Sequence, residues 1–372
     1  MNQKAADVKR EMNYELLRIV AMVMVVTLHY WGKTGFLDNV PASEPGFYVA
    51  WFFESCCICA VNCYVLLTGF FMCEKKFKVS RVLRVWLQVL EYTVILYLVS
   101  CLVGMNTFEL PGLKKSLLPI TNETYWFMTK YLFLLILSPF LNLLIEKCDK
   151  VCLGAFCGSL FAVFCVLPSI FHYSDFLNLA RGYSLPWFVC LYIFGAYVKK
   201  FGVPFFASKG KCMAGYLLSV LCIYVPRVIF GLLKCYADKD IGYAKVLYNY
   251  NFVFTLLSAL FLFGFFKNMK IKSKAAERVI AFLAPATLGV YLLHLNDYSV
   301  KWFFRGILRP QDIGNPGLLI LHSLFIILAV YLICAMVEKI RLWIFETNPL
   351  MKKAFAGIDK LIKFDGHLLD KQ

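Results

Sequence analysis

The chain contains 372 residues, of which 60% are hydrophobic and 17% charged, and its mean hydropathy is +0.68. Soluble globular domains have about 45–50% apolar and about 25% charged residues, so these values exclude a soluble enzyme and a secreted disulfide-stabilised domain. The formal net charge of +16 is typical of a membrane protein with basic cytoplasmic loops, and we expect no nucleic-acid partner.

Apolar runs bounded by charged residues predict ten membrane spans, because a transmembrane helix needs about 20 mostly apolar residues. These runs are 14–32, 47–72, 82–104, 125–146, 151–171, 184–200, 212–233, 246–266, 279–298 and 317–338. The predicted fold class is an all-α integral membrane protein with about ten transmembrane helices. We expect a membrane domain over 1–340 and a cytoplasmic tail over 341–372.

Lysine and arginine concentrate in the segments that lie in the cytoplasm if the N-terminus is inside, most densely in 75–84. Positive charge favours the cytoplasmic side, so both termini are predicted to be cytoplasmic. In the tail, apolar residues recur at helical spacing from Leu350 to Ile362 with lysines between them. This pattern predicts an amphipathic helix that contacts the lipids of the inner membrane surface.

Fifteen cysteines are present, and nearly all lie inside apolar runs. In such runs cysteine behaves as a small hydrophobic residue. Cys56 and Cys59 form a C-x-x-C sequence within an apolar helix, which we interpret as core packing. No metal site is predicted.

The first span contains three ionisable residues, Glu15, Arg18 and His29. Eleven residues separate Arg18 from His29, which places them within about 20° of each other on an α-helix, three turns apart. Ionisable residues inside the membrane are costly and usually mark a functional site. The alternative is that Arg18 and Glu15 form an interfacial ion pair.

Five ionisable side chains from five spans are predicted to share one layer. At a rise of 1.5 Å per residue, all five lie about 20–25 Å from the inner end of their spans. They are His29, Glu54, Arg227, His294 and His322. For two of them a structural role is the alternative, because His322 is near a helix end and Arg227 follows Pro226, where it would stabilise a kink.

Arg81 and Arg84 lie three residues apart at the start of the third span. Neighbouring guanidinium groups at this spacing can bind a phosphate, which predicts a site for a phosphate-bearing donor from the cytosol. The alternative is ordinary positive-inside charge bias. The sequence contains no glycine-rich nucleotide motif.

Several motifs resemble those of the acyltransferase-3 family of integral membrane acyltransferases. Arg18 and His29 resemble its R-x10-H signature, and Arg81-x-x-Arg84 resembles its basic R-x-x-R motif. Thr68-Gly69-Phe70 is similar to its Ser-Gly-Phe sequence, with threonine keeping the hydroxyl. Two further matches are Trp126-Phe127 with Ser138-Pro139 and Asn142, and Tyr291-Leu292-Leu293-His294.

The resemblance covers nearly the whole chain. It implies transfer of an acyl group, usually acetyl from acetyl-CoA, to a hydroxyl of a cell-surface polysaccharide or its lipid-linked precursor in a bacterial plasma membrane. Acetyl-CoA would be a substrate, and no permanently bound cofactor is expected.

From this resemblance and, for Glu54 and Arg227, from depth along the spans, we assign roles to eight residues. His29 is the candidate general base, Arg18 would line the donor path, and Glu54 would orient His29. Arg81 and Arg84 are the candidate residues for binding CoA phosphates. The candidate substrate-binding residues are Trp126, His294 and Arg227.

Two other functions stay open on the sequence. A transporter or flippase for a lipid-linked sugar would use the same polar layer as its path. A member of the other large family of membrane-bound O-acyltransferases would use a deep histidine with an asparagine, which His294 and Asn296 match loosely.

Overall fold

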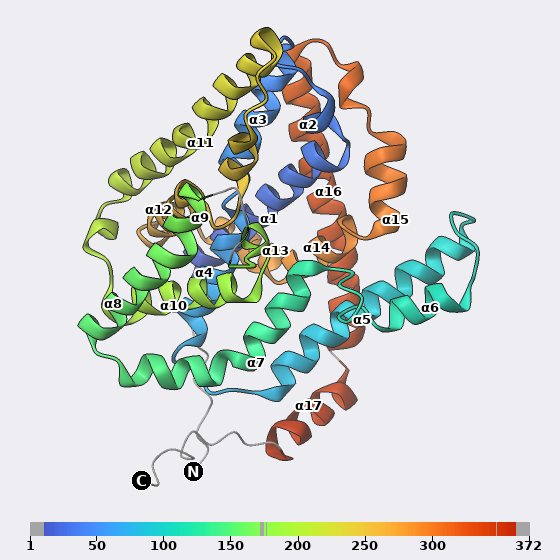
Figure 1. Cartoon of the computed structure of the whole chain (residues 1–372). Coiled ribbons are helices and arrows are strands. Elements are labelled where there is room, and N and C mark those ends of the chain that lie inside the picture. The colour runs from blue at the N-terminus through green and yellow to red at the C-terminus, as the bar shows by residue number, and fades with distance from the viewer. Residues whose placement is uncertain (1–10, 172–174, 176, 347, 362–372) are drawn as a thin grey trace.

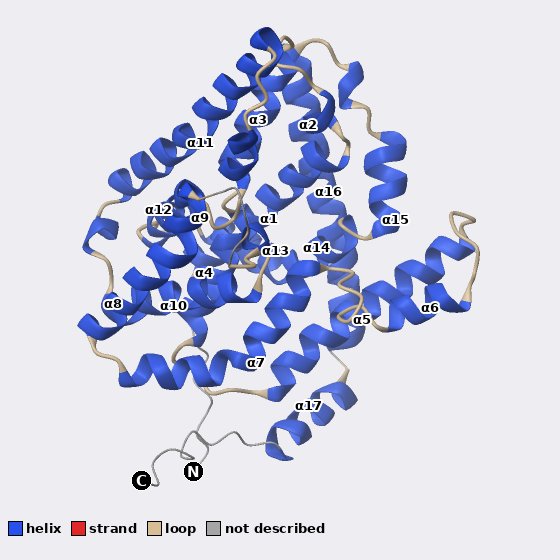
Figure 2. Ribbon diagram, in the orientation of Figure 1, coloured by secondary structure: helices blue, strands red, loops and turns tan. Residues whose placement is uncertain are grey.

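The computed structural model describes residues 11–171, 175, 177–346 and 348–361. Helices connected by loops make up this part of the chain, and no strand occurs in it (Figures 1 and 2). The helices are α1 (Met12–Lys33), α2 (Phe36–Asn39), α3 (Pro45–Cys57), α4 (Ala60–Met72), α5 (Val79–Leu102), α6 (Leu110–Leu117), α7 (Trp126–Lys147), α8 (Lys150–Phe161), α9 (Leu167–Ile170), α10 (Leu185–Phe201), α11 (Lys209–Ala237), α12 (Val253–Lys267), α13 (Lys274–Leu283), α14 (Thr287–His294), α15 (Asp297–Ser299), α16 (Pro316–Arg341) and α17 (Pro349–Leu361).

Nine helical segments of the described chain are long and apolar enough to cross a membrane, which confirms the predicted fold class. Three of the nine combine two helices, such as α3 with α4 over Pro45–Met72 and α13 with α14 over Lys274–His294. The expected span 184–200 corresponds to α10, which has 17 residues and lies at the short end of the range that crosses a bilayer. Packing against α4, α7 and α8 buries α10 inside the bundle.

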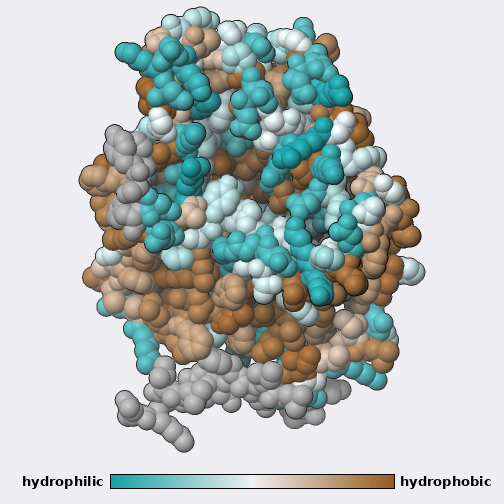
Figure 3. Space-filling model, turned by 45° about the vertical axis from the view of Figure 1, so that its right-hand side comes forward, coloured by the Kyte–Doolittle hydropathy of each residue, from teal (hydrophilic) through white to brown (hydrophobic). Residues whose placement is uncertain are grey.

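Central and peripheral spans differ in how much of their surface the protein covers. The protein buries 78% of the most apolar stretch of Pro45–Met72, but only 11% of that of Lys150–Ile170. Peripheral helices expose large apolar side chains, including Leu321, Phe325 and Leu328 on α16. Apolar residues likewise cover most of the lower half of the face in Figure 3. These surfaces suit contact with lipid tails.

Glycine allows α4 and α10 to pack with their backbones in contact. A Cβ atom on Gly69 would lie 2.0 Å from the Tyr192 carbonyl oxygen, and one on Gly195 would lie 2.2 Å from the Leu66 carbonyl oxygen. Small residues permit such close approach between membrane helices. The close spacing of these two helices therefore depends on Gly69 of the Thr68-Gly69-Phe70 motif and on Gly195.

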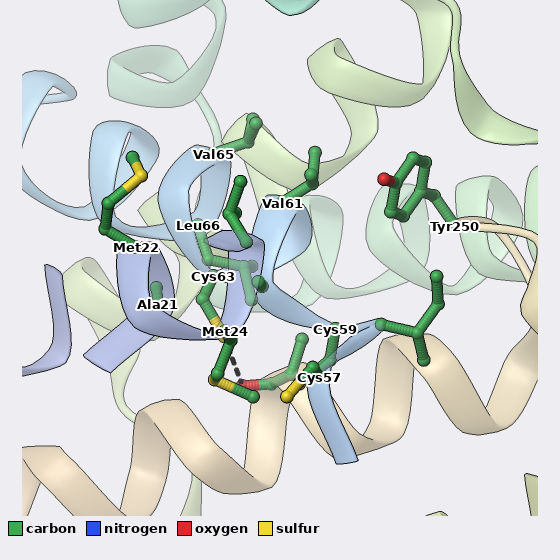
Figure 4. Packing of buried hydrophobic residues seen from close by; sticks show 14 of the residues in the cluster. Ala21, Met22, Met24, Cys57, Cys59, Val61, Cys63, Val65, Leu66 and Tyr250 are labelled. Atoms are coloured by element: carbon green, nitrogen blue, oxygen red, sulfur yellow. Dashed lines mark hydrogen bonds between the residues drawn. The ribbon is translucent and has the colours of Figure 1, made fainter. Parts of the chain in front are cut away.

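Cysteines of α3 and α4 pack in the core beside α1, as Figure 4 shows for Cys57, Cys59 and Cys63 near Met24. All fifteen cysteines are free. The Sγ atom of Cys63 lies 3.8 Å from the Ala259 carbonyl oxygen on α12. These contacts agree with the interpretation of the C-x-x-C sequence as packing.

A buried ionic cluster joins α5 to the C-terminal end of α16. Arg341 donates to Glu338 at 2.8 Å and to Glu91 at 2.9 Å, and Gln88 donates to Glu338 at 3.0 Å. Glu338 is fully buried beside Gly289 of α14. The Arg341 guanidinium thus links two carboxylates and joins α16 to α5, while Glu338 packs against α14.

The predicted tail helix forms as α17 and packs on the N-terminal end of α5 (Figure 1). The Asp359 carboxylate accepts hydrogen bonds from the backbone N–H of Ser80 at 3.0 Å and from its hydroxyl at 2.7 Å. Asp359 therefore satisfies a free N–H group at the start of α5. Residues 362–372, the end of the predicted tail, lie outside the described residues.

Candidate active site

A cavity of about 770 Å³ lies between α1, α4, α7 and α14. Its wall on α1 extends from Glu11 to His29, and these eighteen positions span about 27 Å along the helix. Lys75 and Lys199 line the cavity near the ends of α4 and α10 at the same side as Glu11, whereas His29 and Trp126 line its far end. The cavity therefore extends through much of the thickness of the bundle.

The polar face predicted for the first span is one wall of this cavity. Glu11, Glu15, Arg18, Met22, Val25 and His29 line it at successive intervals of three and four residues. This spacing places all of them on one face of α1. The shared face of Arg18 and His29 is thus confirmed.

The facing wall comes from α4 and the loop after it, again at intervals of three and four residues. Tyr64, Thr68, Phe71 and Lys75 line the cavity. Tyr64 donates a hydrogen bond of 2.5 Å to the Arg18 carbonyl oxygen, which ties this wall to α1. The close packing of α4 on α10 fixes the same wall from behind.

His29 and His294 meet at the deep end of the cavity. The Nδ1 atom of His29 lies 2.8 Å from Nε2 of His294, and Nδ1 of His294 lies 2.5 Å from the Val290 carbonyl oxygen. His294 is 3% exposed, whereas His29 is half-buried and lines the cavity. The chain thus joins two residues that are 265 positions apart in the sequence.

These contacts determine where the protons lie on a neutral histidine pair. A carbonyl oxygen only accepts hydrogen bonds, so Nδ1 of His294 carries a proton and its Nε2 is an acceptor. His29 then donates from Nδ1, which leaves Nε2 of His29 without a proton. His29 is therefore arranged as a base whose partner is another histidine.

A sequence model described as an acyltransferase domain matches residues 13–339 of the chain, nearly its whole length. The chain belongs to the acyltransferase-3 family. It is accordingly a membrane acyltransferase. No curated protein and no solved structure matches the chain.

The helix that carries His294 is held in this acyltransferase by Tyr125. Tyr125 donates to the Leu292 carbonyl oxygen at 2.7 Å and accepts from the Asn296 side-chain amide at 3.1 Å. Both Tyr125 and Asn296 are buried. Asn296 also accepts a hydrogen bond from the Tyr298 backbone N–H through its side-chain oxygen. Through these two contacts it supports the end of α14.

Arg18 combines the two roles considered from the sequence. Its Nη1 atom donates to Glu15 at 2.7 Å, which is the ion pair given as the alternative, and it still lines the cavity. Its guanidinium lies 5.5 Å from the centre of the Phe71 ring. Arg18 therefore lines the cavity as one half of an ion pair that also contacts an aromatic ring.

Trp126 lines the deep end of the cavity as part of an aromatic cluster. Its ring stacks on Tyr250 with a centroid distance of 5.7 Å and contacts Tyr183 at 4.4 Å. Asn62 fixes this cluster, because its amide donates to the Tyr250 carbonyl oxygen at 2.8 Å and accepts from Trp187 at 3.1 Å. An aromatic wall beside a base suits a ring-shaped substrate.

Glu54, Arg227 and His322 do not line the cavity. His29 has His294 at its Nδ1 atom, so the histidine takes the orienting position expected for Glu54. Among the described residues, Oε2 of Glu54 is buried without a hydrogen-bond partner. Counting residues from the inner end of each predicted span placed Glu54 at the depth of His29. That count does not give the rotation of a helix about its own axis, which decides where its side chains point.

Arg227 and His322 have other contacts. The Arg227 guanidinium lies 3.8 Å from the centre of the Trp51 ring, which links α11 to α3. His322 pairs with the Tyr30 hydroxyl at 2.8 Å. The contact of His322 agrees with the structural role given as its alternative, whereas Arg227 joins two helices rather than stabilising a kink at Pro226.

Arg81 and Arg84 also lie outside the cavity lining, and they point to different neighbours. Arg84 is exposed, and its guanidinium lies 4.5 Å from the centre of the Phe355 ring on α17. Arg81 is half-buried and close enough to Lys75 for its charge to lower the pKa of that amine. The two arginines therefore do not form one fork that faces the cavity.

Sequence reasoning missed several cavity residues. Tyr64, Thr68 and Lys75 repeat at intervals of four and seven residues, so the helical spacing of the second span, continued to Lys75, contained a signal for them. Lys199, Tyr250 and Tyr291 come from segments without such a pattern. In the described part of the chain, no group of three His, Cys, Asp or Glu residues has the arrangement of a metal site.

Proposed function

We propose that this acyltransferase moves an acyl group, in the simplest case acetyl, from acyl-CoA to a hydroxyl of a cell-surface polysaccharide or its lipid-linked precursor. The observation that supports this proposal is the histidine pair at the deep end of a cavity that begins at the charged ends of α1 and α4. A weakly acidic alcohol needs a general base to attack a thioester, and His29 has a free Nε2 for that role.

The proposed reaction transfers one proton and one acyl group. His29 Nε2 takes the proton of the acceptor hydroxyl while its oxygen attacks the thioester carbonyl carbon. The tetrahedral intermediate collapses, the carbon–sulfur bond breaks, and the CoA thiolate receives the proton from His29. His294 stabilises the positive charge on His29 in between, because its Nε2 accepts from the His29 Nδ1–H.

The two ends of the cavity offer separate binding places for the two substrates. The donor would enter at the side of Lys75 and Lys199, and the acceptor would bind at the aromatic wall of Trp126 and Tyr250. Aromatic rings and aliphatic side chains line most of the space between these ends. Such a lining excludes water and so protects the thioester from hydrolysis.

The test is to give membranes that contain the protein acetyl-CoA with a labelled acetyl group. We expect release of free CoA thiol together with label in the carbohydrate fraction, and neither in membranes with the His29→Ala variant. Movement of a lipid-linked sugar across the membrane without thiol release would instead assign the protein as a transporter.

The proposal also needs the Lys75 side of the cavity in the cytoplasm, with both termini on that side. Cys152 and Cys235 are exposed, so the labelling test starts from a background in which both are replaced by serine. In intact cells an impermeant thiol reagent should label Gly314→Cys, which has open space around its Cα. It should not label Lys272→Cys. The reverse pattern would place the donor entrance outside.

A further inference from the structure

The entrance of the cavity carries cations that the catalytic proposal does not use. Arg18, Lys75 and Lys199 line it, together with Glu11, Glu15 and Glu74. Glu15 pairs with Arg18. Among the described residues, neither Lys75 nor Lys199 forms an ion pair with a carboxylate.

Both lysines instead contact aromatic rings of α4. The Lys75 ammonium lies 5.8 Å from the centre of the Phe71 ring, and the Lys199 ammonium lies 4.9 Å from that of Phe70. The two rings pack edge to face with a centroid distance of 5.1 Å. A ring attracts a cation only weakly compared with an anion, so both charges remain available to a ligand.

The surroundings of Lys75 are positive. Burial lowers the pKa of the Lys75 amine, and the charges of Arg81, Arg18 and Lys199 lower it further, against one opposing carboxylate, Glu15. Glu15 already binds Arg18, and Glu11 and Glu74 are the other carboxylates of the lining. Neither Lys75 nor Lys199 pairs with them among the described residues, so the two ammonium groups can together bind an anion with more than one charge.

The lysines come from two segments whose separation is fixed. Lys75 follows α4 and Lys199 lies near the end of α10, and these helices pack through Gly69 and Gly195. The backbone positions that carry the two ammonium groups are therefore set by this packing before a ligand binds. A phosphate at this position would have its attached acyl chain directed along the cavity toward His29.

We propose that Lys75 and Lys199 bind the phosphate groups of the acyl donor, with Arg81 contributing charge from outside the cavity lining. The proposal rests on the proposed function, because it takes the donor to be a CoA thioester. It assigns the donor's phosphates to residues other than the Arg81 and Arg84 pair. The neighbouring Lys76 and Lys200 are excluded from the site, since neither lines the cavity.

The test measures binding of CoA, and of pantetheine as the same arm without nucleotide or phosphates, to the purified full chain in nanodiscs. Lys75→Ala and Lys199→Ala should each raise the Kd of CoA about tenfold or more, because charge-assisted contacts are lost. Pantetheine should bind the wild type and both variants equally. Lys76→Ala is the matched control and should bind CoA like the wild type.

Two further variants and a salt dependence separate charge from packing. Lys199→Gln keeps most of the aliphatic contact with Phe70 but removes the charge, so it should match Lys199→Ala. Lys75→Arg keeps the charge and should retain CoA affinity to within about threefold. Higher salt should weaken CoA binding to the wild type more steeply than to Lys75→Ala.

Equal losses in Lys76→Ala and Lys75→Ala, or unchanged CoA affinity in both Lys75→Ala and Lys199→Ala, would overturn the proposal. A lipid headgroup is the other source of phosphate. If phosphatidylglycerol nanodiscs weakened CoA binding relative to phosphatidylcholine in the wild type but not in Lys75→Ala, the site would belong to lipid and the proposal would fall.

The two proposals fail separately. Lysine-dependent CoA binding without acyl transfer would keep this site and reject the reaction. Acyl transfer from acetyl-CoA with normal CoA affinity in both lysine variants would keep the reaction and reject the site.

Discussion

The two ends of the cavity hold their functional groups by different means. At the deep end, His29, His294 and the Val290 carbonyl form a line of neutral hydrogen bonds at 2.8 and 2.5 Å. At the entrance, Lys75 and Lys199 face aromatic rings and have no carboxylate partner among the described residues. The deep end fixes the position of a proton, and the entrance presents charge.

This difference predicts different sensitivities. A hydrogen-bonded relay works only with particular donor and acceptor atoms, so a conservative substitution breaks it. A charge at an open entrance acts over several ångströms and depends on salt, so another cation can replace it. Substitutions at the deep end should therefore change kcat, and those at the entrance should change affinity.

The largest expected effect is that of His29→Ala. General acid–base groups contribute about 10²–10⁴-fold to a rate, so kcat for acyl transfer should fall by that amount. The Kd of CoA should not change, because the phosphates would bind at the other end of the cavity. His322→Ala is the control and should keep most of the activity, since His322 contacts Tyr30 rather than the cavity. Substantial turnover by a well-folded His29→Ala variant would reject His29 as the base.

A smaller loss is expected for His294→Ala. This change removes the hydrogen-bond acceptor that holds His29 in one tautomer. Loss of such a supporting partner typically lowers activity about 10–100-fold, so we expect a fall in kcat of that size. The pH dependence of kcat should change shape as well, because His29 would no longer be held by one partner. A variant with a reduced rate and an unaltered pH profile would indicate that His294 serves only for packing.

At the entrance, Arg81→Ala and Arg84→Ala should differ. Arg81 is near Lys75, so its loss should raise the KM for acyl-CoA about two- to fivefold, as for a partly exposed charge. Arg84 stacks on Phe355, and its loss should leave KM unchanged. Equal increases in KM would show that both arginines of the R-x-x-R motif bind the donor.

The smallest effect concerns the docking of α17. Hydrogen bonds from Ser80, with the nearby charges of Lys78 and Arg84, lower the pKa of Asp359 below its ordinary value of 3.8. Because the folded-state pKa is lowered, this contact stabilises docking above pH 3.8 and loses that contribution as the pH falls through the lowered pKa. At neutral pH, Asp359→Asn should speed hydrogen exchange at the Ser80 amide, and Lys360→Ala should not. Equal exchange in both variants would contradict the contact.

Part of the site follows from local sequence pattern. Arg18 and His29 share a cavity wall because an α-helix repeats every 3.6 residues, and that repeat can be counted without a structure. The position of Lys75 on the same stripe as Tyr64 and Thr68 could have been counted in the same way. The spans themselves follow from apolar length, because the bilayer requires it.

What the sequence determined by itself is the class of molecule, the polar face of the first helix and the motifs of the acyltransferase-3 family. Only the tertiary structure decided that His294 rather than Glu54 meets His29, that Arg84 turns to α17, and that Lys199 joins Lys75. The physical reason is that helical periodicity fixes which residues share a face of one helix. The rotation of each helix toward its neighbours is set by packing, here by contacts such as Gly69 on Tyr192 between segments far apart in the chain.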